Sequence, residues 1–194
     1  ALDGVEAMNH MVNLLREHVP EATRIHYVIT RGGAAPNIVP EFAEVFYYVR
    51  HPDMEQLRGI WDRVVAASEG AALGTGTRVE HEVIHGNFNV LPNEVLAKVM
   101  DVSLHSVGGV TYTGQERAFA ESIRATLGAT EMELESAALV QPYKLSRGKA
   151  STDVGDVSWT VPTAGLTTAT WVPGTAAHSW QAVAAGATGI GIKG

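Results

Sequence analysis

The sequence has 194 residues and a formal net charge of −7, with 45% hydrophobic residues, 18% charged residues and no cysteine. That length fits one large domain or two small ones, and the composition is typical of a chain with a packed core. The negative charge argues against a nucleic-acid-binding protein, and the lack of cysteine excludes disulfides and thiolate metal sites. No apolar run approaches the roughly 20 residues of a membrane helix. The first residues lack a signal-peptide pattern, so we expect a cytoplasmic protein.

The beginning of the chain predicts a helix followed by two strands. Apolar residues recur every three or four positions over residues 2–19, which indicates an amphipathic helix. In residues 24–30 the side chains alternate between two faces, and residues 43–50 are rich in Val, Phe and Tyr. Both patterns favour β-strands.

A second helix and a third strand are predicted next. Asp53 is a good N-cap, and the Gly-rich stretch 70–76 predicts a turn or flexible loop after the helix. Residues 78–85 alternate again and predict a strand. The order of these elements is that of a ferredoxin-like split βαβ unit without its first strand.

Helical patterns return in the second half and then fade. Asn93 is predicted to cap one helix, and Thr113 with Glu116 forms a capping box at the start of another. After about residue 140, short apolar runs such as 166–172 suit buried strands.

Both ends of the sequence look cut within a larger fold. Three strands leave an unpaired edge where a strand before the first helix should lie. The final stretch, Gly189–Gly194, stops without a closing element. We therefore expect two incomplete domains, over residues 1–92 and 93–194, in a piece of a larger protein.

His26 is predicted to point away from the helices, on the open face of the sheet. An imidazole there can donate a hydrogen bond to a carbonyl or an oxyanion. Shortly after it, Gly33 would let the backbone approach a ligand closely, and Asn37 offers both a donor and an acceptor. A polar strand residue followed by a Gly-Pro turn explains the same pattern, and spacing alone favours that alternative.

Hydroxyl-bearing and small residues gather in the second half. Ser151, Thr152 and Asp153 can hold a substrate carboxylate, and a capped turn explains them equally well. His178 follows a Gly-Thr loop and is a candidate metal ligand. One ligand makes no metal site, however, and a lone histidine is more often a capping or core residue.

Five stretches of the chain together carry a family resemblance: Ala1–Asn9, Arg24–His26, Gly32–Pro40, Ser151–Ser158 and His178–Trp180. They resemble the dinuclear-metal amidohydrolase and carboxypeptidase family, which includes aminoacylases and glutamate carboxypeptidases. The likeness runs over nearly the whole chain and keeps the family's order of motifs. The strings Gly-Gly-x-Ala-Pro-Asn and Ser-Thr-Asp-Val-Gly-Asp-Val-Ser are its most specific parts.

The resemblance implies an α/β protein of the α+β kind. Residues 1–92 would form a ferredoxin-like lid that also serves dimerisation, and residues 93–194 would form the C-terminal part of a mixed-sheet catalytic domain. In such enzymes a lid histidine and asparagine reach the substrate. The match makes His26 the candidate catalytic residue and Asn37, with Gly33 beside it, a candidate substrate-binding residue.

The same match places the Ser151–Asp153 turn beside the substrate and makes His178 the candidate metal ligand. The implied activity is metal-dependent hydrolysis of the amide bond of an N-acyl amino acid. An aromatic acyl-glutamate of the aminobenzoyl-glutamate kind is the preferred substrate. The implied cofactors are two divalent ions, zinc or manganese.

The implied partners are a small acyl-amino-acid substrate and a second subunit, in a homodimer or heterodimer formed through the lid. Neither nucleic acid nor a membrane is expected. The family's other metal ligands lie in an N-terminal half that nothing in this sequence matches, so we expect the 194 residues alone to be inactive. The alternative, from a different class, is a non-catalytic dimerisation or partner-binding module.

Overall fold

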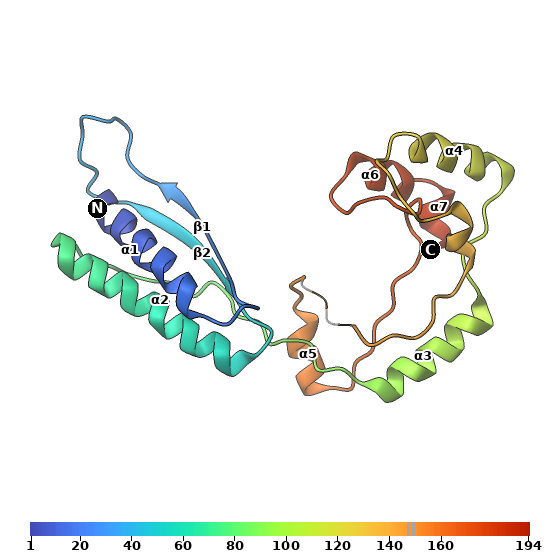
Figure 1. Cartoon of the computed structure of the whole chain (residues 1–194), viewed down its shortest axis with the longest axis horizontal. Coiled ribbons are helices and arrows are strands. Elements are labelled where there is room, and N and C mark those ends of the chain that lie inside the picture. The colour runs from blue at the N-terminus through green and yellow to red at the C-terminus, as the bar shows by residue number, and fades with distance from the viewer. Residues whose placement is uncertain (147, 149) are drawn as a thin grey trace. The chain divides into compact units, whose positions relative to one another are not determined.

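A computed structural model describes residues 1–146, 148 and 150–194 of the chain (Figure 1). The chain divides into two compact units, residues 1–89 and residues 90–194. The sequence pattern predicts the domain boundary between residues 92 and 93. Whether the two units are a lid and part of a catalytic domain stays a prediction.

The first unit packs two helices on one face of an antiparallel strand pair. Figure 1 shows α1 and α2 running side by side along the strands. The elements in chain order are α1 (Leu2–Leu15), the short 3-10 helix η1 (Arg16–His18), β1 (Arg24–Arg31), β2 (Glu44–Arg50) and α2 (Met54–Thr75).

The core of the first unit lies between the helices and one face of the sheet. Its buried members are Val12, Leu15, Ile25, Ile60, Val64 and Ala67. Because side chains alternate along a strand, the burial of Ile25 places its neighbours Arg24 and His26 on the opposite, helix-free face. This alternation confirms the expected strand at residues 24–30, which β1 extends by one residue.

The stretch 70–76 does not form the predicted loop, because α2 continues to Thr75 and ends at Gly76, whose φ is 65°. Ala71 and Ala72 are buried in the helix. At Gly70, an added Cβ would lie 3.2 Å from Met11 Cε, so the missing side chain lets α1 pack closely. Packing between the two helices outweighs the low helix propensity of glycine here.

The predicted strand at residues 78–85 is also wrong, since these residues have no regular secondary structure. In a split βαβ unit another strand lies between the two that the helix connects. Among the described residues of the first unit no such strand exists, so residues 78–85 have no ladder to join. Val83 and Ile84 are accordingly exposed.

In the described residues of the second unit, the regular secondary structure consists of helices. Its elements are α3 (Glu94–Val107), α4 (Gly114–Arg124), the 3-10 helix η2 (Leu134–Ala138), α5 (Val154–Thr160), α6 (Trp180–Gly186) and α7 (Gly189–Lys193). The predicted caps are confirmed: Asn93 accepts a hydrogen bond from Leu96 N, and Thr113 with Glu116 forms a complete capping box.

The core of the second unit joins residues far apart in sequence: Ala120, Ile123, Leu134, Val172, Ala185 and Ile190. Of the run 166–172, which was predicted to be a buried strand, Val172 alone is buried, and no strand forms there. An extended run needs a neighbouring strand, and the described part of this unit supplies none. The α+β class of the whole chain is nevertheless confirmed.

No helix in the described ranges has both the length and the apolar character needed to cross a membrane.

Candidate functional site

His26 lies on the helix-free face of the strand pair, as expected. Its partner across the sheet is Tyr48, and both side chains are exposed. The Tyr48 ring meets the Phe46 ring edge-on, with 5.1 Å between the ring centroids. The imidazole therefore sits beside an exposed aromatic surface on a rigid strand, and it is open to a ligand.

Two arginines extend this face next to His26. Arg24, two residues before His26, lies opposite Arg50 in the register of the sheet. Within the described parts of the chain, neither guanidinium forms an ion pair with a carboxylate. Like charges directly opposite each other destabilise a sheet, and a bound anion would relieve this repulsion. We call Arg24, His26 and Arg50 the cationic face.

Both arginines are held in place by neutral groups. Arg24 Nη1 donates hydrogen bonds to the backbone carbonyls of Glu21, at 2.7 Å, and Thr23, at 2.6 Å. The Arg50 guanidinium carbon lies 5.0 Å from the centroid of the Tyr48 ring. Each guanidinium has five N–H donors, so both keep donors for a carboxylate. The cationic face can bind the carboxylate of a small molecule beside an imidazole donor.

Sequence reasoning missed both arginines. Arg24 could have been found, because a residue two positions from His26 in a strand shares its face. The contribution of Arg50 depends on the pairing register of β1 and β2. Twelve residues of loop separate the strands and leave that register undetermined by the sequence.

Gly33 and Asn37 lie in the loop between β1 and β2. Gly33 has a φ of 108°, a backbone conformation that residues with a Cβ rarely adopt, so the turn itself favours glycine. The loop is tied back where Ala1 N donates a hydrogen bond to Pro40 O at 2.9 Å. Asn37 is exposed, and its amide is therefore accessible to a ligand.

Ser151, Thr152 and Asp153 form an exposed turn directly before α5. Thr152 Oγ1 accepts a hydrogen bond from Val154 N at 3.2 Å, so this hydroxyl stabilises the turn. Asp153 occupies the N-cap position, and its carboxylate makes no capping hydrogen bond. The turn thus follows the capping alternative at Thr152, while Ser151 and Asp153 present polar groups to solvent.

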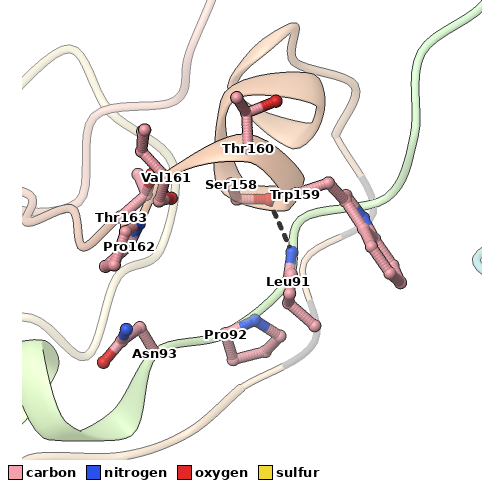
Figure 2. Close-up of a pocket in the computed structure, with 9 residues that line it drawn as sticks. All are labelled: Leu91, Pro92, Asn93, Ser158, Trp159, Thr160, Val161, Pro162 and Thr163. Carbon is pink, nitrogen blue, oxygen red and sulfur yellow. Dashed lines mark hydrogen bonds between the residues drawn. The ribbon is translucent and has the colours of Figure 1, made fainter.

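A pocket of about 250 Å³ lies at the other end of α5, lined by residues 91–93 and 158–163 (Figure 2). The Ser158 hydroxyl accepts a hydrogen bond from Leu91 N at 2.8 Å and donates one to Gly155 O at 2.6 Å. Ser158 is 6% exposed, so the hydroxyl fastens the start of the unit to α5. None of the predicted site residues lines this pocket.

His178 precedes α6 and has a left-handed backbone, with a φ of 60°. Its side chain is exposed, so it is not a core histidine. It is not the helix cap either, because Ser179 Oγ accepts the hydrogen bond from Ala182 N at 3.2 Å. A left-handed conformation costs an L-residue about 1–2 kcal/mol, and such strain is concentrated at functional sites.

Among the described residues, no group of three or more His, Asp and Glu side chains could hold a metal ion. His26, Gly33 and Asn37 belong to the first unit, while the Ser151–Asp153 turn and His178 belong to the second. Within each unit, no hydrogen bond joins these residues directly to one another in the described structure. Within the first unit, the structure brings the predicted His26 together with Arg24 and Arg50, which the sequence did not single out.

Comparison with known proteins gives sequence relatives over the whole chain. The chain is 38% identical to a subunit of the p-aminobenzoyl-glutamate hydrolase of Escherichia coli over 220 aligned positions, which cover 100% of this chain and 46% of the relative. It is 29% identical to the Xaa-Arg dipeptidase of Mus musculus over 84% of this chain and 32% of the relative. The human Xaa-Arg dipeptidase is 34% identical over 50% of the chain.

No family model matches the chain. The chain spans less than half the length of each of these relatives. The relatives include a hydrolase of an acyl-amino acid and dipeptidases, by their names. The homologues of this chain are thus an aminobenzoyl-glutamate hydrolase subunit and Xaa-Arg dipeptidases, which are M20 peptidases.

Proposed function

We propose that this chain is part of an enzyme that hydrolyses the amide bond of an N-acyl amino acid, with an aromatic acyl-glutamate of the aminobenzoyl-glutamate kind as the preferred substrate. The names of the relatives support the reaction class. The observation that carries the proposal is the cationic face, because an N-acyl amino acid has a free carboxylate for two uncompensated guanidiniums to bind.

We propose that the first unit binds the substrate and stabilises the negative charge that forms on the amide oxygen during hydrolysis. Arg24 and Arg50 hold the substrate carboxylate, which fixes the distance of the scissile amide from the sheet. His26, on the same face, donates a hydrogen bond to the oxyanion that forms when water attacks the amide carbonyl. Asn37 in the exposed loop contributes a further donor to the substrate.

In the second unit, the Ser151–Asp153 turn offers one free hydroxyl and one carboxylate at the start of α5. We propose that Ser151 and the backbone amides of the turn bind a polar group of the substrate. Thr152 shapes the turn, since its hydroxyl already accepts Val154 N. The Asp153 carboxylate, which makes no capping hydrogen bond, would accept a hydrogen bond from a neighbouring donor and so orient it.

The described residues do not fit a metal centre by themselves, because no group of three or more His, Asp and Glu side chains forms among them around His178 or elsewhere. We propose that His178 contributes one ligand to a centre for two zinc or manganese ions and that the remaining donors come from polypeptide outside these 194 residues. The accessible ring and the strained backbone of His178 support this role.

The proposed partners are the acyl-amino-acid substrate and a second subunit that associates through the first unit. The Escherichia coli relative is named as one subunit of a hydrolase, which supports an assembly of more than one chain. We also propose a cytoplasmic location for the protein.

The proposal is tested with the complete protein containing this chain, assayed with aminobenzoyl-glutamate while its zinc and manganese contents are measured. His178→Ala should lower the metal content and slow hydrolysis by about 100-fold or more. His81→Ala, which changes another exposed histidine, is the matched control and should change neither. Equal metal content and equal activity in all three proteins would favour the non-catalytic partner-binding module instead.

A further inference from the structure

Arg16, in η1, contacts both residues that flank His26 in β1. Its Nη2 donates a hydrogen bond of 2.6 Å to Ile25 O, and its guanidinium carbon lies 5.8 Å from the centroid of the Tyr27 ring. Because side chains alternate along a strand, Ile25 and Tyr27 lie on the face opposite the imidazole of His26. Arg16 therefore holds the strand immediately before and immediately after His26.

The Ile25 carbonyl lies at an edge of the sheet without a neighbouring strand. The sheet that the structure describes has two strands, and the donor to this carbonyl comes from η1 rather than from a strand. Backbone groups at such an edge need another hydrogen-bond partner. Ile25 is 4% exposed, so Arg16 rather than water satisfies its carbonyl.

The aromatic ring beside Arg16 is itself held by α1. Asn13 Nδ2 donates to the Tyr27 hydroxyl at 3.4 Å, and the Tyr27 ring packs against the Tyr47 ring with 5.2 Å between the centroids. The Tyr47 hydroxyl donates in turn to Asn9, which is buried in α1. Successive turns of α1 thus fix the ring over which the Arg16 guanidinium lies.

The position of the His26 imidazole depends on the backbone of β1. The side chain is exposed, and in the described structure no hydrogen bond orients its ring. The bond from Arg16 to Ile25 O is a strong constraint on that backbone, because a hydrogen bond from a charged donor is roughly twice as strong as a neutral one. Arg16 also forms no ion pair among the described residues that would draw it away.

We infer that Arg16 is a positioning residue, which keeps His26 in place for the oxyanion by holding the strand on both sides of it. The inference rests on the proposed function and adds to it a residue that acts through His26. A donor stabilises a developing charge only if it is fixed beforehand, and a displacement of about 1 Å can slow a reaction about 100-fold. Arg24 and Arg50 bind the carboxylate separately, so the loss of Arg16 should affect kcat rather than KM.

Kinetics of the complete protein with aminobenzoyl-glutamate test the inference. Arg16→Gln should lower kcat about tenfold and change KM by less than about twofold. Because Arg16 acts through His26, the same substitution in a His26→Ala protein should lower kcat by less than about twofold. A tenfold loss in both backgrounds would show that Arg16 acts independently of His26, and it would overturn the inference.

Arg63→Gln is the matched control, because Arg63 Nη1 also donates to a backbone carbonyl of the first unit, His18 O, at 3.0 Å. Arg16→Gln and Arg63→Gln should lose similar stability in urea unfolding, but Arg63→Gln should keep the full kcat. An equal loss of kcat in Arg63→Gln would attribute the effect to general destabilisation and overturn the inference.

Arg16→Lys replaces Arg16→Gln in these assays if the glutamine variant does not fold. It keeps a charged donor for the Ile25 carbonyl and loses the planar group beside Tyr27. Its kcat should be about threefold lower, and this loss should disappear in the His26→Ala background. The same threefold loss in both backgrounds would contradict the positioning role.

NMR relaxation of the backbone amides in the 194-residue chain separates this inference from the proposed function. Arg16→Gln should make residues 25–27 more mobile, and Arg63→Gln should not. If the relaxation data agree and the complete protein hydrolyses nothing, Arg16 holds the strand and the proposed function is wrong. If hydrolysis occurs while Arg16→Gln keeps the full kcat or leaves the mobility unchanged, only the positioning role of Arg16 is wrong.

Discussion

Arg24 and Arg50 lie opposite each other in the antiparallel pair of β1 and β2, without a carboxylate partner in the described structure. A cross-strand pair of like charges weakens a sheet by a few tenths of a kcal/mol up to about 1 kcal/mol. A fold that keeps such a pair beside an exposed histidine gains nothing in stability from it. The pair therefore points to anion binding.

Phosphate should stabilise the chain through this pair. About 100 mM phosphate is expected to raise the free energy of unfolding by about 0.5 kcal/mol more in the unchanged chain than in Arg50→Gln, because a bound anion relieves the repulsion. Urea unfolding with and without phosphate measures both values. The same increment in both proteins would show that Arg50 takes no part in binding the anion.

The Tyr47 hydroxyl should stabilise the first unit. It donates a hydrogen bond of 2.5 Å to Asn9 Oδ1, and Asn9 is 6% exposed. Tyr47→Phe leaves the buried amide oxygen unpaired and is expected to cost roughly 1–3 kcal/mol of the free energy of unfolding. Tyr48→Phe, on the exposed helix-free face, is the control and should change stability by less than about 0.5 kcal/mol.

The same hydroxyl predicts a loss of stability in alkali. Burial, with a smaller contribution from Tyr27, raises the pKa of Tyr47 above its ordinary value of 10. Because the folded state holds the proton more tightly than the unfolded state, the stabilisation is complete below pH 10 and declines as the pH rises above it. Unfolding measured from about pH 8 to about pH 11 should show a steeper decline in the unchanged chain than in Tyr47→Phe. Parallel curves would exclude the effect.

Glycine at position 178 should stabilise the second unit. The φ of His178 is 60°, where an L-residue is strained and glycine is not. After subtracting the greater flexibility of unfolded glycine, we expect His178→Gly to raise the free energy of unfolding by about 0.5–1 kcal/mol. His178→Ala keeps the strain and should stay within about 0.5 kcal/mol of the unchanged chain. Thermal unfolding of both variants distinguishes them, and equal stability would refute the strain.

Ser158→Ala should destabilise the second unit by roughly 1–3 kcal/mol. The substitution removes the buried acceptor of Leu91 N and leaves that amide unpaired. Ser103→Ala is the matched control, because the Ser103 hydroxyl is exposed on α3 and bonds within its own helix. Chemical unfolding of the two variants should differ accordingly. A Ser158→Ala protein as stable as Ser103→Ala would show that this hydroxyl does not fasten α5.

Local signals in the sequence predicted the helix starts. Asp53, Asn93 and Thr113 each accept a hydrogen bond from a backbone amide of the first helical turn, as their side-chain chemistry requires. Such caps involve residues three positions apart, so the sequence contains the whole interaction. The open position of His26 followed in the same way from strand alternation.

Features that depend on distant contacts were not predictable. The Gly-rich end of α2 stays helical because α1 packs against Gly70 through Met11. Residues 78–85 alternate as a strand should, yet a strand forms only where a partner offers a ladder. The juxtaposition of Arg24 and Arg50 depends on the register, and the left-handed backbone of His178 leaves no signature in the residue type.

The most direct test of the central claim is the rate of glutamate release from aminobenzoyl-glutamate by the complete protein, compared between the unchanged sequence and His26→Ala. We expect hydrolysis by the unchanged protein and a kcat about 100-fold lower for His26→Ala, because the oxyanion loses a donor. His85→Ala, at another exposed histidine of the first unit, should retain the full rate. Absence of hydrolysis by the unchanged protein, or an unchanged kcat for His26→Ala, would show that His26 does not serve amide hydrolysis.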